Sequence, residues 1–551
     1  MLKRSVHIFI IGLLAMPGLA AAKGTVQLPA TNQTTCFDSK GNVRTCDDVG
    51  GVAWPAPRFI DKGDGTVNDK LTGLTWSKHA NAPNRALPGD LPNACLNAEK
   101  DMIWLDALDF IACLNAKNHA GSKNWRLPNL NELESMVNLE FVDSSAYLNS
   151  SGFGFPGLLL TDVKSSPYWT ATSDSSDTVI QSAAAAWEVD LAKGDSFSTL
   201  KNERKRGVWP VRDGDSSGPA QLRQTGQAGC FDDLGDTRPC ATMGEDGEKL
   251  AGAVWPASRF QVNAGAPFAF DRVTGLIWST ATQTPGPAAC ADTGLNLDWQ
   301  QALDHVACLN TNTYLGRSDW RLPNRKELQS LTDYSKGAPA LPGGHPFNDK
   351  VGKTYWSATS DASVPRNARV VSMLDGTLSS AVKTGTLPVW PVSGPDLTPP
   401  NLTVTQGIAR TKIASQIISG TVEAGGSVDV VVNGGAPVAA TVNGTDWSFT
   451  IKPLALGLNN ITVIAADFSE NPATAAVNPI TFIPPDGLIS GGSVVSISDA
   501  MRALRIAVGL IQPSSDDLLR GDVAPLGAPD DRISLSDVLL ILRKAVGLPS
   551  Y

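Results

Sequence analysis

The chain has 551 residues, of which 42% are hydrophobic and 18% charged, a composition typical of folded rather than disordered protein. A chain of this length is too long to fold around a single hydrophobic core, and it predicts about three to five domains of roughly 100 to 200 residues each. The formal net charge of -9 excludes the sequence-independent attraction to phosphates on which nucleic-acid binding depends, so we expect no nucleic-acid partner.

The N-terminal segment, residues 1–22, has the features of a secretory signal peptide. Lys3 and Arg4 precede an apolar run at residues 8–14, and small alanine residues close the segment. This run is too short to span a bilayer, and no later stretch is long and apolar enough to predict a transmembrane segment. We therefore expect an exported protein, extracellular or at the cell surface, with the periplasm as the alternative.

A pentapeptide, Trp-Arg-Leu-Pro-Asn, occurs twice, at residues 125–129 and 320–324. In each copy a glutamate, Glu132 or Glu327, follows the asparagine by three residues, which is the pattern of a capping box at a helix start. The motif therefore predicts a strand that leads into a helix. Upstream, residues 104–112 carry apolar side chains at helical spacing and predict a second helix.

All eight cysteines lie in these two copies, and their spacing repeats. They are Cys36, Cys46, Cys95 and Cys113 in the first copy and Cys230, Cys240, Cys290 and Cys308 in the second. Because the spacing repeats and an exported protein folds in an oxidising compartment, we predict that the first cysteine of each set pairs with the second and the third with the fourth. The two other pairings remain open, and a metal site is an alternative that no Cys-x-x-Cys pair supports.

Two further motifs recur in the same order in both copies. They are Thr-Gly-Leu-x-Trp at residues 72–76 and 274–278, and Tyr-Trp-x-Ala-Thr-Ser-Asp at residues 168–174 and 355–361. Together with Trp-Arg-Leu-Pro-Asn, they resemble the Lcl C-terminal domain family, a group of secreted and surface bacterial domains described as C-type-lectin-like. The resemblance covers residues 30–215 and 227–394. It implies two α+β domains linked to adhesion and glycan contact, without a shared catalytic signature.

Candidate ligand contacts lie where the two copies differ. C-type-lectin-like domains usually place their binding surface in long loops, here residues 140–165 and 335–352. Near the closing strands, Arg212 has no basic counterpart in the second copy, and Trp187 is replaced there by Arg369. Because the counterpart of Trp187 is not aromatic, we predict that Trp187 is exposed, whereas tryptophans inside the shared motifs are predicted to be core residues.

Residues 401–484 follow a proline-rich linker and consist of short alternating runs separated by glycine and asparagine turns. This pattern predicts an all-β antiparallel sandwich. Two stretches, residues 419–425 and 466–471, resemble bacterial immunoglobulin-like repeats, which commonly act as spacers on secreted proteins. The resemblance implies no chemistry.

The last segment, residues 485–551, repeats internally at 38 residues, because residues 495–510 return as 533–548. Each repeat ends in an amphipathic helix, and the pair resembles a dockerin, in which two loop–helix units bind calcium. Calcium takes six to eight oxygen ligands. The residues that would supply them in the second loop are Asp522, Asp530, Ser534 and Asp537. The first loop lacks acidic residues at the expected places, and a metal-free helical module is the alternative.

No nucleophile with a matching base is shared by the two copies, so we do not expect an enzyme. The sequence predicts a secreted or cell-surface adhesin or binding protein, whose two heads contact a glycan or a surface protein and gain avidity from the duplication. The dockerin-like module would attach to a cohesin-like partner, with calcium as its cofactor. The alternatives are a structural envelope protein that binds only protein partners and a polysaccharide hydrolase.

Overall fold

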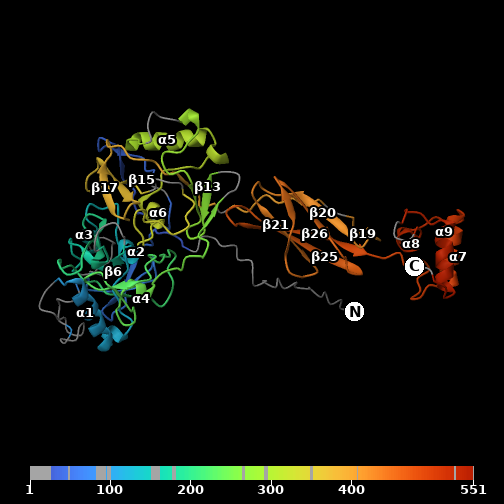
Figure 1. The fold of residues 1–551 in the computed structure, drawn as a ribbon, viewed down its shortest axis with the longest axis horizontal. Coiled ribbons are helices and arrows are strands. Elements are labelled where there is room, and N and C mark those ends of the chain that lie inside the picture. Colours follow the sequence, from blue (N-terminus) through green and yellow to red (C-terminus); the bar gives the residue numbers. More distant parts are fainter. Residues whose placement is uncertain are drawn as a thin grey trace, which may run out of the picture. The chain divides into compact units, whose positions relative to one another are not determined.

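The computed structural model describes residues 26–47, 50–81, 95, 101–149, 160, 162–175, 182–262, 267–290, 296–347, 352–396, 398–405, 408–525 and 529–549. Two compact units are present (Figure 1): one spans Ala22–Asp396, which we call the head, and the other contains Leu397–Tyr551. The segment predicted to be a signal peptide, residues 1–22, lies outside the described residues.

The two copies in the head share one order of strands and main helices. The first copy contains β1 (Cys36–Phe37), β2 (Val43–Arg44), β3 (Phe59–Asp61), β4 (Thr66–Asp69), β5 (Thr75–Ser77), α1 (Trp104–Ala116), η3 (His119–Gly121), α2 (Leu130–Glu134), α3 (Ser144–Asn149), β6 (Tyr168–Asp174), η4 (Ser182–Ala184), β7 (Ala185–Asp190), β8 (Asp195–Leu200) and β9 (Val211–Arg212).

The second copy keeps the order of the strands and of the helices α5 and α6, adds the short helix α4 after its second cysteine, and has no counterpart of α3 or η4 in its described residues. It contains β10 (Cys230–Phe231), β11 (Thr237–Arg238), α4 (Asp246–Lys249), β12 (Phe260–Val262), β13 (Phe268–Asp271), β14 (Leu276–Ser279), η5 (Ala288–Cys290), α5 (Trp299–Thr311), η6 (Tyr314–Gly316), α6 (Arg325–Ser330), β15 (Thr354–Ser360), β16 (Asn367–Ser372), β17 (Leu378–Val382) and β18 (Val392–Ser393). Mixed helices and strands in both copies agree with the predicted α+β class.

The predicted capping boxes are present at the start of α2 and α6. Asn129 accepts a hydrogen bond from the backbone N–H of Glu132 at 2.9 Å, and the Glu132 carboxylate accepts from the Asn129 N–H at 2.8 Å. Asn324 and Glu327 repeat both bonds. The capping box satisfies two N–H groups that the first helical turn leaves unpaired, and it fixes the helix directly behind the shared pentapeptide.

One sheet joins the two copies. Strands β6, β7 and β8 of the first copy and β15, β16 and β17 of the second form a single six-stranded sheet, in the order β15-β16-β17-β8-β7-β6. The junction pairs β8 with β17, antiparallel, with Ser196 opposite Leu378. Because β8 and β17 are equivalent strands, the copies meet as in an isologous dimer. The equivalent helices α1 and α5 accordingly lie at opposite ends of the head (Figure 1).

Four disulfides are formed among the described residues, with the predicted pairing: Cys36–Cys46, Cys95–Cys113, Cys230–Cys240 and Cys290–Cys308. Each lies within one copy. Two of them close the short hairpins β1–β2 and β10–β11, which we call the cysteine loops.

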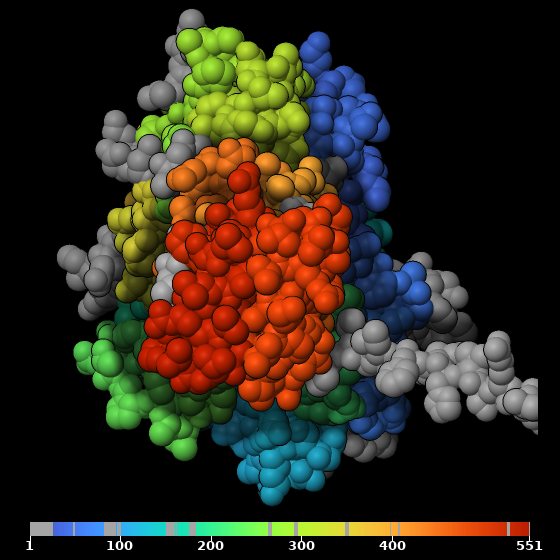
Figure 2. All heavy atoms as spheres, turned by 90° about the vertical axis from the view of Figure 1, so that its right-hand side faces the viewer, coloured from blue at the N-terminus to red at the C-terminus, as the bar shows by residue number. Residues whose placement is uncertain are grey.

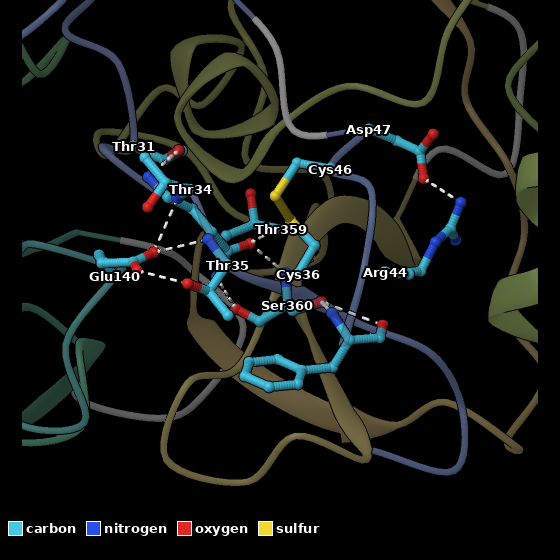
Figure 3. Close-up of a disulfide and its surroundings, with 12 residues drawn as sticks. Thr31, Thr34, Thr35, Cys36, Arg44, Cys46, Asp47, Glu140, Thr359 and Ser360 are labelled. Carbon is cyan, nitrogen blue, oxygen red and sulfur yellow. Dashed lines mark hydrogen bonds and ion pairs between the residues drawn. A yellow bond between two sulfur atoms is a disulfide. The ribbon is translucent and has the colours of Figure 1, made fainter. Parts of the chain in front are cut away.

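The cysteine loop of the first copy packs on the second copy. Gln33, just before Cys36, accepts from the backbone N–H of Ser360 at 2.7 Å and donates to the Ser360 carbonyl at 2.9 Å. Figure 3 shows this loop between two anchors: Ser360, from β15, and Glu140 of the first copy, which accepts from the N–H groups of Thr34 and Thr35 at 2.7 and 2.9 Å. The loop therefore bridges the copies.

The cysteine loop of the second copy makes the reciprocal contacts. Gln227 accepts from the backbone N–H of Ser173 at 2.9 Å, and the ammonium of Lys201 donates to the Phe231 carbonyl at 2.8 Å. Lys383 donates to the Phe37 carbonyl in the equivalent place. Burial lowers the pKa of both lysines to about 8. Each copy thus lends its cysteine loop to the other.

A buried carboxylate in this exchange makes head stability depend on pH. Asp246 accepts from the hydroxyls of Thr172 and Thr225 at 2.7 and 2.6 Å, and burial raises its pKa from 3.8 to about 6. A carboxyl pKa that is higher in the folded state stabilises the fold below the unfolded-state pKa, and this contribution is lost as pH rises through about 6.

The free energy of unfolding of the native head is expected to fall between pH 4 and pH 7, and Asp246→Asn is expected to make this fall smaller by about 2 to 3 kcal/mol. Calorimetric unfolding of the full chain across this range measures the effect. Asp236→Asn, at an exposed residue of the neighbouring cysteine loop, serves as the control. Identical pH profiles for native protein and Asp246→Asn would contradict the assignment.

The second unit begins with two facing sheets. Their strands are β19 (Arg410–Thr411), β20 (Gln416–Thr421), β21 (Ser427–Val432), β22 (Val438–Ala439), β23 (Thr441–Asn443), β24 (Asp446–Ile451), β25 (Gly457–Ala466) and β26 (Pro472–Phe482). One sheet has the order β19-β26-β25-β21-β22 and the other β20-β24-β23. Ile418 and Trp447 of the second sheet and Val430 and Val463 of the first belong to one core. This is the predicted all-β sandwich architecture.

The C-terminal module contains three helices in its described residues, α7 (Ile497–Ala507), α8 (Ser515–Gly521) and α9 (Leu535–Ala545). Each helix has a Ser-x-x-Asp capping box at its start. The repeated helices α7 and α9 pack against each other over a small core that includes Ala503 and Ile541.

Candidate functional site

Trp187 lies on β7 and is 2% exposed, so the prediction that it is exposed is wrong. Its ring packs edge-on against Tyr334 of the second copy, with the ring centroids 5.0 Å apart. The physical reason is the position of β7, which lies inside the six-stranded sheet where the copies meet. The aromatic side chain therefore serves the contact between copies.

Arg369 occupies the equivalent place on β16 and is also buried. Its guanidinium donates to Asp195 of the first copy at 2.9 Å and to Asp361 at 3.2 Å. Burial lowers its pKa. Because Asp195 belongs to the first copy and Asp361 to the second, the arginine, like Trp187, holds the copies together.

Arg212 is half-buried on β9, and its guanidinium lies 5.4 Å from the Trp125 ring centroid. It belongs to the sheet β3-β4-β5-β9, whereas Trp187 and Arg369 belong to the six-stranded sheet. The structure thus does not bring the three candidate ligand residues into one site.

The two predicted binding loops are partly described. Residues 144–149 of the first form helix α3, because Asp143 accepts from the N–H groups of Ser145 and Ala146 and so caps the segment. The other parts of these loops include residues 150–159 and 348–351, which lie outside the described residues.

A cavity of about 320 Å³ opens beside the Thr-Gly-Leu turn of the first copy. Its lining includes Thr72, Gly73, Glu132 and Asp213 of the first copy and Gly252 of the second. The turn approaches the chain after β9 so closely that a Cβ at Gly73 would lie 2.3 Å from the Ser216 carbonyl oxygen, and its φ is +80°. Only glycine fits both constraints. This geometry explains the glycine in the shared motif.

An arginine from the shared pentapeptide holds the two carboxylates of this cavity. Arg126 donates to Glu132 at 2.5 and 2.7 Å and to Asp213 at 2.8 Å. Burial alone would lower the pKa of Arg126, but the two ion pairs raise it above its ordinary value. The Asp213 side chain is 87% exposed, so this carboxylate faces solvent in a fixed position. It can accept hydrogen bonds from the hydroxyl or N–H groups of a ligand.

The equivalent arginine of the second copy has a different second partner. Arg321 keeps its pair with Glu327, but its second partner is the backbone carbonyl of Gly394, at 3.1 Å. Gly50 of the first copy approaches the same pair, since a Cβ there would lie 2.8 Å from a Glu327 carboxylate oxygen. The exposed carboxylate is therefore a property of the first copy.

The family model of the Lcl C-terminal domain matches residues 65–212 and 268–393. The chain contains two Lcl C-terminal-like domains. No curated protein matches the chain. The matched segments begin after the cysteine loops, so the part of each domain that is similar to the family excludes the segment exchanged between the two domains.

Outside the Lcl C-terminal-like domains, the predicted calcium ligands Asp522, Asp530 and Ser534 lie in the loop before α9, and Asp537 lies in the first turn of α9. Both carboxylate oxygens of Asp537 accept hydrogen bonds from this loop: one from the N–H groups of Val523 and Ala524 at 2.7 Å, the other from the N–H and hydroxyl of Ser534 at 2.8 Å. The lone pairs of the Asp537 carboxylate that calcium would need are therefore directed at N–H and O–H donors. Calcium could use them only after the loop rearranges.

A lysine occupies the other half of the predicted site. The ammonium of Lys412, from the loop after β19, bonds to Asp522 and lies 2.9 Å from an Asp531 carboxylate oxygen. Asp522 also accepts from the N–H groups of Asp530 and Asp531. No group of three or more His, Cys, Asp or Glu side chains in the described residues is arranged to hold a metal ion. Calcium binding stays a prediction.

The helices of the C-terminal module carry a repeated exposed apolar surface, which we call the apolar ridges. Eight apolar side chains, in pairs 38 residues apart, are each between 47% and 73% exposed: Ile497, Met501, Val508 and Leu510, and Leu535, Leu539, Val546 and Leu548. Figure 2 presents the side of the molecule on which the two repeats, orange-red to red, lie next to each other. Exposed apolar surface that recurs on both repeats is a candidate interaction site.

None of the described helices is long and apolar enough to cross a bilayer. The apolar ridges lie on the short helices α7 and α9 and on the residues that directly follow them, and their exposure was not predicted from the sequence. The repeat period of 38 residues was the signal that could have found them, because both members of every pair are apolar.

Proposed function

We propose that the protein is an exported binding protein, in which the head contacts a glycan or a surface protein and the C-terminal module attaches the chain to a protein partner. In this proposal the Lcl C-terminal-like domains are C-type-lectin-like, the sandwich is immunoglobulin-like and the C-terminal module is dockerin-like. Disulfides in both domains favour an oxidising, extracytoplasmic location.

The observation that carries the proposal is the pair of apolar ridges. An amphipathic helix normally turns its apolar face to the core and its polar face to solvent. In α7 and α9 the core side is already filled by residues such as Ala503 and Ile541, and a second apolar face remains outside. A partner protein would bury this face and gain about 25 cal/mol for each Å² of apolar surface covered.

The attachment is tested with full-length protein as bait for envelope proteins of the producing cell. The variant Met501→Asp/Leu539→Asp places a charge on each ridge, whereas the control Ser498→Asp/Ser536→Asp places the same charges on exposed serines of the same helices. We expect one stoichiometric partner that the control retains and the ridge variant loses. Equal capture by both variants would contradict the proposal.

Ligand contact by the head is supported by the cavity beside the Thr-Gly-Leu turn and its solvent-facing Asp213. Because Arg126 fixes this carboxylate, a ligand hydroxyl would meet an acceptor that needs no reorganisation. Asp213→Asn is expected to weaken binding on a glycan array roughly tenfold, since hydrogen bonds to charged groups contribute about 1.5 to 3 kcal/mol. Unchanged binding by Asp213→Asn would exclude this cavity as the ligand site.

A further inference from the structure

The sandwich carries a hydroxyl-lined groove that the proposed function does not use. Its cavity has a volume of about 390 Å³ and lies on the three-stranded sheet β20-β24-β23. Residues 403–405 extend this sheet, because Thr403 and Thr405 donate their N–H groups to the carbonyls of Thr421 and Ser419. The groove therefore spans four neighbouring strands.

Strand register places the groove's side chains in two rows across the sheet. One row is Thr405, Ser419, Ser448 and Thr441, and the other is Thr403, Thr421, Asp446 and Asn443. Neighbouring strands lie about 4.8 Å apart, and alternate residues face the same side. Of the residues between the rows, Trp447 belongs to the core, and Val404 and Val442 pack against it. The outward face is thus a regular array of short polar groups.

The rows are held in place by their own contacts. The hydroxyls of Thr403 and Thr421 are 2.6 Å apart, and the Thr403 hydroxyl also accepts from the Thr421 N–H at 2.9 Å. Gly420 lets the strands approach, since a Cβ there would lie 2.0 Å from the Thr403 carbonyl oxygen. Short side chains also lose little rotamer freedom on binding.

The chemistry of the lining selects the ligand. Of the ten residues that line the groove, all within the described part of the chain, six are Ser or Thr and one, Asp446, is charged. Hydroxyl groups both donate and accept hydrogen bonds. The lack of lysine and arginine in the lining disfavours phosphate or sulfate groups, and the polar rows disfavour an apolar peptide. A ligand with many hydroxyls and no charge fits this lining.

We propose that the hydroxyl-lined groove of the sandwich binds a neutral polysaccharide chain. The sandwich would then contact the surface to which the protein adheres, rather than only separate the head from the C-terminal module. This site is independent of the head cavity and of the apolar ridges.

The experiment is affinity electrophoresis of the full-length protein in native gels that contain galactomannan or a soluble β-glucan, with alginate as the anionic comparison. Thr421→Val/Ser448→Ala removes one hydroxyl from each row. Thr474→Val removes an exposed hydroxyl from the opposite sheet, on β26, and is the matched control. Thermal unfolding of each variant shows whether the sandwich is still folded.

We expect retardation by at least one neutral polysaccharide, weakened about tenfold or more by the groove variant and unchanged by Thr474→Val. Asp213→Asn should leave this retardation intact, which separates the groove from the head cavity. Equal retardation of the groove variant, retardation by alginate alone, or none in either neutral gel would overturn the proposal.

Discussion

Replacing Glu134 by alanine is expected to destabilise the head by about 3 to 5 kcal/mol. Glu134 of the first copy is the carboxylate partner of Arg325 of the second, and both side chains are almost fully buried. Arg325 also donates to the Gly194 carbonyl, and Ser196 donates to Glu134. Without Glu134 the guanidinium would stay buried without its ion-pair partner, and an uncompensated buried charge is the main cost of breaking a buried ion pair.

The matched control removes both charges. Glu134→Leu/Arg325→Leu should be much closer to native stability, because apolar residues of similar size often replace a buried ion pair at little cost. Urea unfolding followed by tryptophan fluorescence reports mainly on the head, since 13 of the 14 tryptophans precede residue 396. If Glu134→Ala unfolds at the native urea concentration, the ion pair does not hold the copies together.

Asp537→Ala is expected to unfold the second repeat of the C-terminal module. The carboxylate receives four hydrogen bonds from the loop and from the start of α9, and bonds to charged groups contribute on the order of 1.5 to 3 kcal/mol each. Small cores of about 70 residues rarely supply more than roughly 3 to 5 kcal/mol in total. The free energy lost with these four bonds therefore exceeds the expected free energy of unfolding of the module.

Hydrogen exchange of α9 peptides in the full chain, with and without calcium, measures this effect. Asp530→Ala is the informative comparison, because its exposed carboxylate belongs to the predicted calcium ligands but not to the cap of α9. We expect α9 to lose protection only in Asp537→Ala. If α9 loses equal protection in Asp530→Ala, and only when calcium is present, the loop is a calcium site. The hydrogen bonds of Asp537 would then contribute less to the stability of α9 than the metal does.

Sequence patterns located the local structure of the head because local physics sets it. The Asn129–Glu132 capping box, the apolar face that begins at Trp104 and the repeated cysteine spacing all depend on residues close in sequence. Each is found in the structure as predicted. The alternation of residues 401–484 likewise predicted a two-sheet sandwich.

The meeting of the two copies could not be predicted in this way, because it pairs residues far apart in sequence. Trp187 packs on Tyr334, where the other copy pairs the equivalent Arg369 with Asp195. In the sequence, a tryptophan in one copy and an arginine at the equivalent position of the other suggested an exposed ligand residue. The structure gives another reason for the difference: the two equivalent residues contact different partners where the copies meet, so each needs a different side chain.

The helical repeat of the C-terminal module was predicted from the sequence, whereas its calcium site stays a prediction. The sequence shows which loop residues carry oxygens, whereas only the structure shows that the Asp537 oxygens face N–H donors and that Lys412 pairs with Asp522. Exposure of the apolar ridges is also a tertiary property, because it depends on which helix face the small core occupies.

The most direct test of the account is whether the two Lcl C-terminal-like domains are one body. A protease recognition sequence inserted between Ser216 and Ser217, at exposed residues between the domains, allows the full chain to be cut there. No disulfide among the described residues joins the copies. The exchanged cysteine loops and the shared sheet predict that the fragments co-elute in native size-exclusion chromatography and separate only in denaturant. Two separate, folded fragments in native buffer would contradict the account.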